Sequence, residues 1–105
     1  MTPFQKEIYR ALSKIPRGYV TSYGEIAEYL GTKAVRAVGT AVGKNPNAPE
    51  VPCHRVVRSS GALGNYSGEG GVTTKIRLLR EEGVFVENDY IKDFTHCFYR
   101  FKKGV

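Results

Sequence analysis

Apolar residues recur at helical intervals along the first stretch of the chain. They are three or four positions apart, which is the period of one helix face, and comprise Phe4, Ile8, Leu12 and Ile15. Thr2 and Gln5 have the spacing of a capping box, in which each side chain accepts a hydrogen bond from the other residue's backbone N–H. The pattern therefore predicts a helix that begins after Thr2 and stops at the Pro-Arg-Gly sequence of residues 16–18.

Two shorter patterns follow, and both predict helices. The first begins at Ser22, which has capping-box spacing to Glu25, and ends at Gly31. The second runs from about Lys33 to Gly43, with Thr32 as a candidate cap. A longer helix followed by two short ones that are joined by a glycine-containing turn is typical of a helix-turn-helix unit.

The helix predicted to end at Gly43 has two different faces. At 100° per residue Val35, Val38 and Val42 lie on one side, which predicts that this side is buried. Apart from two cations, the residues of the opposite side are small: Arg36, Ala37, Thr40, Ala41 and Lys44. Small side chains allow close approach, so packing on a neighbouring helix and docking of another surface are equally compatible with this face.

The rest of the chain predicts short extended pieces and one more helix. "GYVTSYG" reads as an extended crossing, and "TTKIRLLREEG" as a helix with Thr73 as its cap and Val72, Ile76 and Leu79 inward. The alternation of aromatic and polar residues after Gly83 predicts a terminal strand or hairpin. No linker or repeat divides residues 1–105, so we expect one mainly α domain with short β pieces, of the helix-turn-helix, winged-helix-like class.

Charge and composition narrow the classes of partner. The net charge of +6 favours a polyanion such as nucleic acid. No apolar run reaches the roughly 20 residues that cross a bilayer, so no membrane partner is expected. The N-terminal sequence lacks the features of a secretory signal, which predicts a cytoplasmic, nucleoid-associated protein.

The two cysteines are the main candidates for chemistry. Cys53 and Cys97 lie far apart in a chain without a secretory signal, which argues against a disulfide. The adjacent pairs "CH" and "HC" lack the spacers that zinc ligands need, and we expect neither a metal nor a cofactor. A nucleophilic Cys53 would need a basic neighbour, but the side chain of His54 would face the other way in a regular strand. Residue types alone therefore leave a buried structural cysteine and a reactive one equally open.

Three motifs favour the reactive cysteine. They are "RAVGTAVGKNP", "PCHRV" and "GNYSG", with "K", "LL" and "EEG" following. In this arrangement the chain, over about residues 4–86, resembles the C-terminal catalytic domain of the O6-alkylguanine-DNA alkyltransferases. The resemblance implies the alkyltransferase type of helix-turn-helix domain, with a divergent tail from about residue 87 and without the separate N-terminal domain of many family members.

The resemblance also implies DNA repair by direct reversal. Such proteins flip an O6-alkylguanine out of the duplex through the minor groove, because the alkyl carbon cannot be reached inside the base stack. Cys53 would accept the alkyl group irreversibly, so each molecule would act once. The expected partner is double-stranded DNA containing O6-alkylguanine, with O4-alkylthymine as a further candidate, bound by a monomer.

Residue roles follow from the same motifs. His54 matches a base that acts on the cysteine through water, Glu82 the carboxylate that orients it, and Asn45 a residue that ties the helix-turn-helix to the active-site turn. Tyr23 matches the tyrosine that drives flipping, and Arg36 the finger that fills the gap left by the base. The other substrate- or DNA-contacting positions implied by the resemblance are Ala37, Thr40, Ala41, Val56, Tyr66 and Ser67.

The resemblance leaves the roles of Lys75 and Glu69 open. Lys75 matches a family lysine near this network, whereas its own pattern indicates a solvated helical charge. A short insertion also brings the acidic Glu69 into the pocket loop.

Alkyltransferase-like proteins have the same motifs but replace the cysteine, so the alternative function is non-catalytic lesion sensing. Because the chain retains Cys53, alkyl transfer is the favoured interpretation.

Overall fold

The computed structural model is mainly helical with two small sheets, and it describes residues 1–66 and 68–101. The expectation of a mainly α domain with short β pieces is confirmed. In chain order the elements are α1 (Pro3–Leu12), β1 (Thr21–Ser22), α2 (Tyr23–Tyr29), α3 (Val35–Gly43), a 3-10 turn η1 (Cys53–Arg55), β2 (Val56–Val57), α4 (Gly71–Glu81), β3 (Val86–Glu87), β4 (Tyr90–Ile91) and α5 (Phe94–Cys97).

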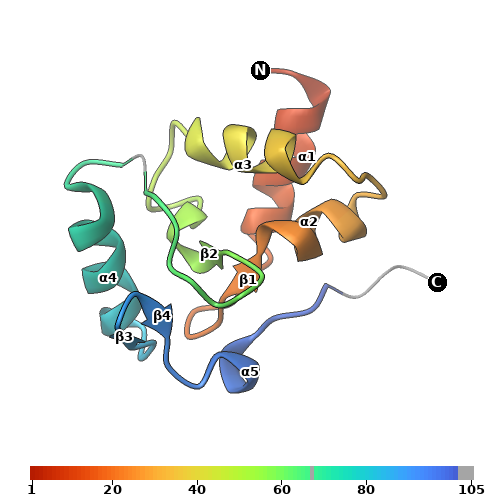
Figure 1. Ribbon diagram of the computed structural model, residues 1–105. Helices are drawn as coiled ribbons and strands as arrows, with labels where there is room; N and C mark the ends of the chain where they lie inside the picture. Colours follow the sequence, from red (N-terminus) through yellow and green to blue (C-terminus); the bar gives the residue numbers. More distant parts are fainter. Residues whose placement is uncertain (67, 102–105) are drawn as a thin grey trace.

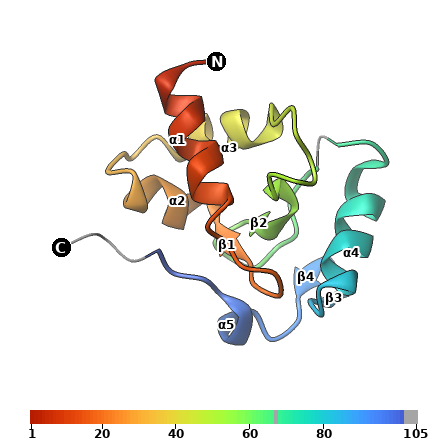
Figure 2. The same cartoon turned by 180° about the vertical axis from the view of Figure 1, so that it is seen from behind.

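The elements form two groups on either side of a central strand pair (Figure 1). Helices α1, α2 and α3 gather on one side, whereas α4 and the β3–β4 hairpin lie on the other, and β1 and β2 run between them. The central strands are parallel, with Thr21 opposite Val56. Seen from behind, α1 lies across the helical group and the C-terminal segment runs beneath it (Figure 2).

Two buried clusters follow this division. The larger one joins the first three helices to Cys53, Val56 and Phe101, and the smaller one joins Val57 to α4 and the hairpin. Because successive residues of a strand face opposite ways, Val56 and Val57 serve different cores although they are neighbours. Among the described residues, no helix has the length and apolar character needed to cross a membrane.

Side-chain caps fix the starts of α1 and α2. Both hydrogen bonds of the predicted capping box between Thr2 and Gln5 are present. The Ser22 hydroxyl accepts from the backbone N–H of Glu25 at 3.0 Å, but the second expected box is only half formed. The Glu25 carboxylate instead accepts from the backbone N–H of Phe101, also at 3.0 Å, and so connects α2 to the C-terminal segment.

The prediction for the two faces of α3 is partly wrong. Val38 and Val42 are buried as expected, but Val35 is 43% exposed and Ala41 only 4%. The helix starts at Val35, later than expected, so this residue lies in the first turn at the edge of the packed face. Ala41 turns toward α1, where its carbonyl accepts a hydrogen bond from the Tyr9 hydroxyl at 3.0 Å.

The start of α4 also differs from expectation. Its N-cap is Gly70 in the left-handed region at φ 86°, so Thr73 lies inside the helix instead of capping it. Val72 is exposed, and the inward positions are Lys75 and Leu79. The predicted hairpin is present as β3 and β4, but the short helix α5 after it was not expected.

Candidate active site

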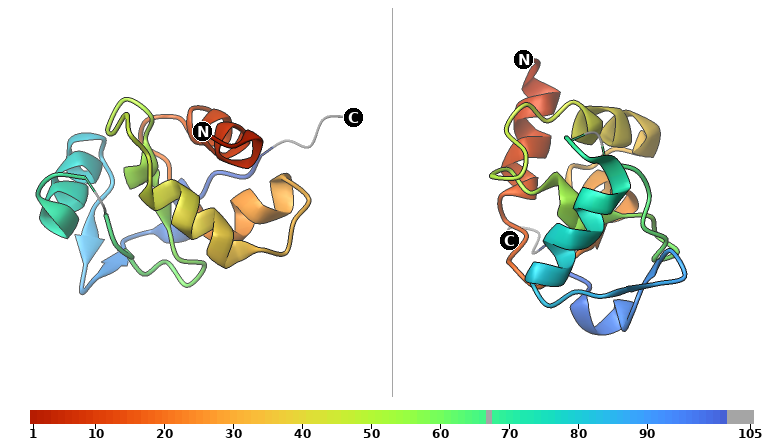
Figure 3. Two further views of the ribbon diagram at one scale, coloured as in Figure 1. Left: turned by 90° about the horizontal axis from the view of Figure 1, so that it is seen from above. Right: turned by 90° about the vertical axis from the view of Figure 1, so that its left-hand side faces the viewer.

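A pocket of about 900 Å³ opens along α3 and contains Cys53. Figure 3 shows α3 between α2 on one side and the segment leading to α4 on the other. These three elements and the η1 turn supply the lining residues: Tyr23, Val35, Arg36, Gly39, Thr40, Val42, Gly43, Cys53, Arg58, Gly64, Asn65 and Tyr66. Cys53 is only 5% exposed, so it lies deep in the pocket while the two arginines are at the surface.

Cys53 begins a tight turn, not a strand. Its backbone N–H donates to the carbonyl of Val51 at 2.8 Å, and its own carbonyl accepts from the N–H of Val56. The alternation expected of a regular strand does not apply inside this 3-10 turn. Nevertheless, within the described part of the chain neither imidazole nitrogen of His54 is hydrogen-bonded to Cys53.

His54 is instead held by Glu82 at the end of α4. The distance from His54 Nε2 to Glu82 Oε2 is 3.0 Å, and the imidazole is 2% exposed. Arg55 donates two hydrogen bonds to the same carboxylate, from Nε at 2.9 Å and from one Nη at 2.8 Å. Its other Nη donates to the Ile15 carbonyl. Burial alone would raise the pKa of Glu82, but the hydrogen bonds from Arg55 and His54 outweigh it and lower that pKa.

This arrangement assigns the tautomer of His54. A carboxylate can only accept, so Nε2 carries the hydrogen and Nδ1 is left with a free lone pair. Burial lowers the pKa of His54, although Glu82 opposes the effect, and the ring is neutral at pH 7. Nδ1 is buried without a hydrogen-bond partner among the described residues, so the neutral ring presents an unused acceptor inside the site.

Lys75 is a buried structural cation, and its interpretation as a solvated helical charge is wrong. Its side chain is fully buried, and Nζ donates to the carbonyls of Val56 at 2.8 Å, Leu63 at 2.7 Å and Asn65 at 3.1 Å. Burial lowers the pKa of Lys75 to about 8. One ammonium group therefore ties the strand after Cys53 to the loop that forms the pocket wall.

Asn45 links the end of α3 to the segment before Cys53. Its amide nitrogen donates to the Val51 carbonyl at 2.6 Å, and its amide oxygen accepts from the backbone N–H of Asn47 at 3.0 Å. Because Val51 in turn accepts from Cys53, two consecutive hydrogen bonds connect α3 to the cysteine turn.

Two tyrosines line the pocket. Tyr23 stands at the first position of α2, and burial raises its pKa, as does the nearby Cys53, while Arg58 partly offsets both. Burial and Cys53 also raise the pKa of Tyr66. Both phenols are therefore protonated at neutral pH and can donate hydrogen bonds into the cavity.

The predicted site residues are only partly brought together. Tyr23, Arg36, Thr40, Cys53 and Tyr66 share the pocket. Ala37 is exposed on α3 but does not line the cavity, and Ser67 lies outside the described residues.

Two predicted contacts are hindered by the packing. Ala41 is only 4% exposed and belongs to the larger core cluster, which leaves little of its side chain for DNA, so its expected contact stays a prediction. Val56 is buried, and its carbonyl already accepts from Lys75, so only a second lone pair would be left for a substrate.

Sequence reasoning missed Arg55 and Arg58. Arg55 follows the Cys-His pair directly, and this adjacency is the one signal that could have drawn attention to it. Glu69, expected in the pocket loop, is exposed and does not line the pocket.

A family model, a relative and a solved structure all relate this chain to methyltransferases that act on methylated DNA. The family model described as "6-O-methylguanine DNA methyltransferase, DNA binding domain" matches residues 3–84. The methylated-DNA–protein-cysteine methyltransferase of Shigella flexneri is 51% identical over 86 residues, which cover 81% of this chain and 49% of that protein. The crystal structure of Mycobacterium tuberculosis OGT in complex with DNA has a TM-score of 0.74 at 49% identity, covering 78% of this chain and 50% of that one.

A second kind of relative matches over its whole length. S. pombe Atl1, in complex with damaged DNA containing O6-carboxymethylguanine, has a TM-score of 0.81 at 30% identity. The match covers 96% of this chain and 98% of that one. The chain thus spans about half the length of the methyltransferases it matches, but nearly all of Atl1.

Proposed function

Because this chain belongs to the 6-O-methylguanine DNA methyltransferase family, we propose that it repairs alkylated DNA by transferring the alkyl group to Cys53. The observation that carries the proposal is the position of Cys53 deep in the α3 pocket, next in sequence to a neutral His54 whose Nδ1 has no partner among the described residues. On this proposal the segment corresponds to the catalytic domain of the family.

The substrate is an O6-alkylguanine that leaves the base stack and enters the pocket. The pocket volume of about 900 Å³ is sufficient for a purine base. Tyr23 and Tyr66 donate hydrogen bonds to the extruded base, and Arg36, exposed at the pocket edge on α3, occupies the gap left in the duplex. Thr40 and the neighbouring Ala37 provide the small surface that lets α3 approach the groove.

Alkyl transfer is a single displacement. The proton of the Cys53 thiol passes through a bridging water to His54 Nδ1, and Glu82 stabilises the imidazolium that forms. The thiolate sulfur forms a bond to the alkyl carbon as the bond from that carbon to O6 breaks. The electron pair remains on O6, which takes up a proton from solvent water, and His54 returns the thiol proton to solvent, so the products are guanine and a Cys53 thioether.

The proposed activity consumes the protein. A thioether is stable to water at neutral pH, so on this proposal each molecule transfers one alkyl group. We propose that a monomer acts on double-stranded DNA in the cytoplasm, at the nucleoid, and that O4-alkylthymine is a candidate second substrate. The net charge of +6 supports a polyanionic partner.

Mass spectrometry tests the proposal directly. After incubation with a duplex containing O6-methylguanine, the protein mass should rise by one methyl group in place of a hydrogen, located on Cys53. Cys97, which lies in α5 outside the pocket, provides the internal control and should stay unmodified. An unchanged mass in a sample that binds the duplex would contradict transfer.

Lesion sensing without chemistry is the second candidate, and a specific observation favours it. The chain matches Atl1 over nearly the full length of both proteins, whereas it covers about half of the methyltransferases. A sensor would bind O6-alkylguanine duplex more tightly than undamaged duplex and keep its mass unchanged. The same experiment therefore separates the two candidates.

A further inference from the structure

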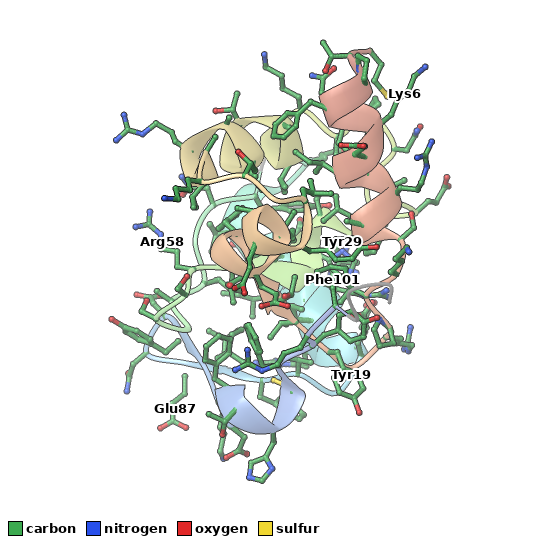
Figure 4. All side chains as sticks on the ribbon, turned by 90° about the vertical axis from the view of Figure 1, so that its right-hand side faces the viewer. Lys6, Tyr19, Tyr29, Arg58, Glu87 and Phe101 are labelled. Atoms are coloured by element: carbon green, nitrogen blue, oxygen red, sulfur yellow. The ribbon has the colours of Figure 1, made fainter. Side chains whose placement is uncertain are left out.

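Arg58 is an exposed arginine at the pocket that the proposed chemistry leaves unused. It lies directly after β2, whose Val57 is fully buried, and lines the pocket together with Arg36 of α3. Within the described residues its guanidinium has neither an ion pair nor a hydrogen bond. In Figure 4 the labelled Arg58 side chain extends outward from the body of the protein. The charge of Arg58 affects the pKa of its neighbours Tyr23 and Lys75, but no hydrogen bond or ion pair among the described residues holds the guanidinium in place.

The backbone of Arg58 is fixed even though its side chain is free. Its N–H donates to the Ala62 carbonyl at 2.9 Å, and its carbonyl accepts from the N–H of Gly61 at 2.8 Å. These two bonds close a tight turn on the strand that follows the Cys53 turn. The base of the side chain is thus held at a constant position relative to the pocket.

Tyr23, Arg58 and Lys75 meet at Gly64. A Cβ atom built on Gly64 would lie 3.7 Å from the Tyr23 hydroxyl, 3.8 Å from Arg58 Cγ and 3.9 Å from Lys75 Nζ. The Arg58 stem and the phenol at the start of α2 therefore both lie next to Gly64, and the Arg58 side chain is exposed. Arg36 and Arg58 both lie at the solvent-exposed mouth of the pocket, Arg36 on α3 and Arg58 on the segment after β2.

An extruded nucleotide places its phosphates at this mouth. Only the base can enter the pocket, so the sugar and the flanking phosphates stay at the rim. A guanidinium matches a phosphate with two parallel hydrogen bonds, and a free, exposed one loses little on forming them. Resting on the proposed function, we propose that Arg58 binds a backbone phosphate beside the flipped nucleotide and thereby positions the damaged strand across from Arg36.

The salt dependence of binding tests this contact. One lost phosphate contact should reduce the slope of log Kobs against log salt by about 0.9 for duplex DNA. Arg58→Ala should therefore bind duplex on the order of tenfold more weakly at low salt, with a slope lower by about that amount. Arg10→Ala is the matched control, because it removes the same charge from an exposed residue of α1 that does not line this pocket, and it should keep the wild-type slope.

Reactivity with a free base separates phosphate binding from damage to the pocket. Arg58→Ala should slow the alkylation of Cys53 by O6-methylguanine duplex more than its alkylation by the free base O6-benzylguanine, which has no phosphate. Arg58→Lys should retain most of the salt slope. An Arg58→Ala slope equal to that of Arg10→Ala, or an equal slowing with the free base, would overturn the proposal. If wild-type protein gains no mass at all, the proposed transfer fails, while the two binding slopes still decide whether Arg58 contacts phosphate.

Discussion

Glu82 joins His54 and Arg55 in the proposed active site. Its carboxylate accepts from His54 and from two donors of Arg55, while the side chain is only 7% exposed. The Arg55 fork keeps the carboxylate ionised, and the ionised carboxylate fixes the tautomer of His54. In the proposed mechanism Arg55 would therefore act on Cys53 only through Glu82 and His54.

Neutralising Glu82 should slow alkyl transfer without preventing DNA binding. In Glu82→Gln the imidazolium that forms during proton removal loses its counter-charge, so the rate should fall by about a hundredfold. Glu81→Gln is the matched control, because Glu81 is the preceding residue and its ion pair with Arg77 is solvent-exposed. Single-turnover rates with O6-methylguanine duplex give the comparison. Equal rates for the two variants would exclude the proposed role of Glu82, and lesion-duplex binding by both would show that they are folded.

Lys75 should make stability rise with pH in an alkaline window. Burial lowers its folded pKa to about 8 from the ordinary 10.5, so between these values the unfolded chain binds more protons than the folded one. The free energy of unfolding should therefore increase by roughly 1.4 kcal/mol per pH unit across the window, relative to a chain without the amine. Urea unfolding of wild type and Lys75→Met from pH 7 to 10 measures this. Curves that stay parallel would contradict a depressed pKa.

At the scale of elements, the sequence predicted the helix caps, but it did not predict which side of a helix would face the core. The caps at Thr2 and Ser22 involve residues three positions apart, and the sequence reveals such contacts. The inward Lys75 could not be predicted from its helix, because its three acceptors come from other segments. The burial of Ala41 similarly depends on how α1 crosses α3. The contact of Glu82 with His54 spans 28 positions, so no spacing rule indicates it, and only the family resemblance suggested the pair.

Asn45 provides a test of how α3 and the Cys53 turn are held together. Asn45→Ala leaves the Val51 carbonyl without its side-chain donor, and the loss should lower the free energy of unfolding by about 1–3 kcal/mol. Asn47→Ala is the control, since the exposed Asn47 contributes only backbone groups to this link, and it should change stability by less than about 0.5 kcal/mol. Chemical denaturation of both variants gives the values. Similar stabilities would mean that the side-chain bridge does not hold the two elements.

The C-terminal segment of the chain runs back to the N-terminal half and is hydrogen-bonded to it. The Val20 N–H donates to Cys97, the Tyr99 N–H donates back to Val20, and the Phe101 N–H donates to Glu25. Figure 4 shows Phe101 beside Tyr29, and the two rings stack with centroids 4.6 Å apart. The tail thus contacts α2, the helix that begins at Tyr23.

Truncating one aromatic ring should show how much the tail contributes. Phe101 is 7% exposed within the larger core, so Phe101→Ala should lower the free energy of unfolding by about 3 kcal/mol through lost burial and the cavity left behind. Phe85→Ala is the matched control, because that ring is 52% exposed in the segment before β3, and its loss should cost under about 1 kcal/mol. Urea unfolding measures both, and equal midpoints would mean that the tail only rests on the surface. Because Glu25 and Tyr29 connect the tail to α2, Phe101→Ala should also weaken binding to lesion-containing duplex, whereas Phe85→Ala should leave it unchanged.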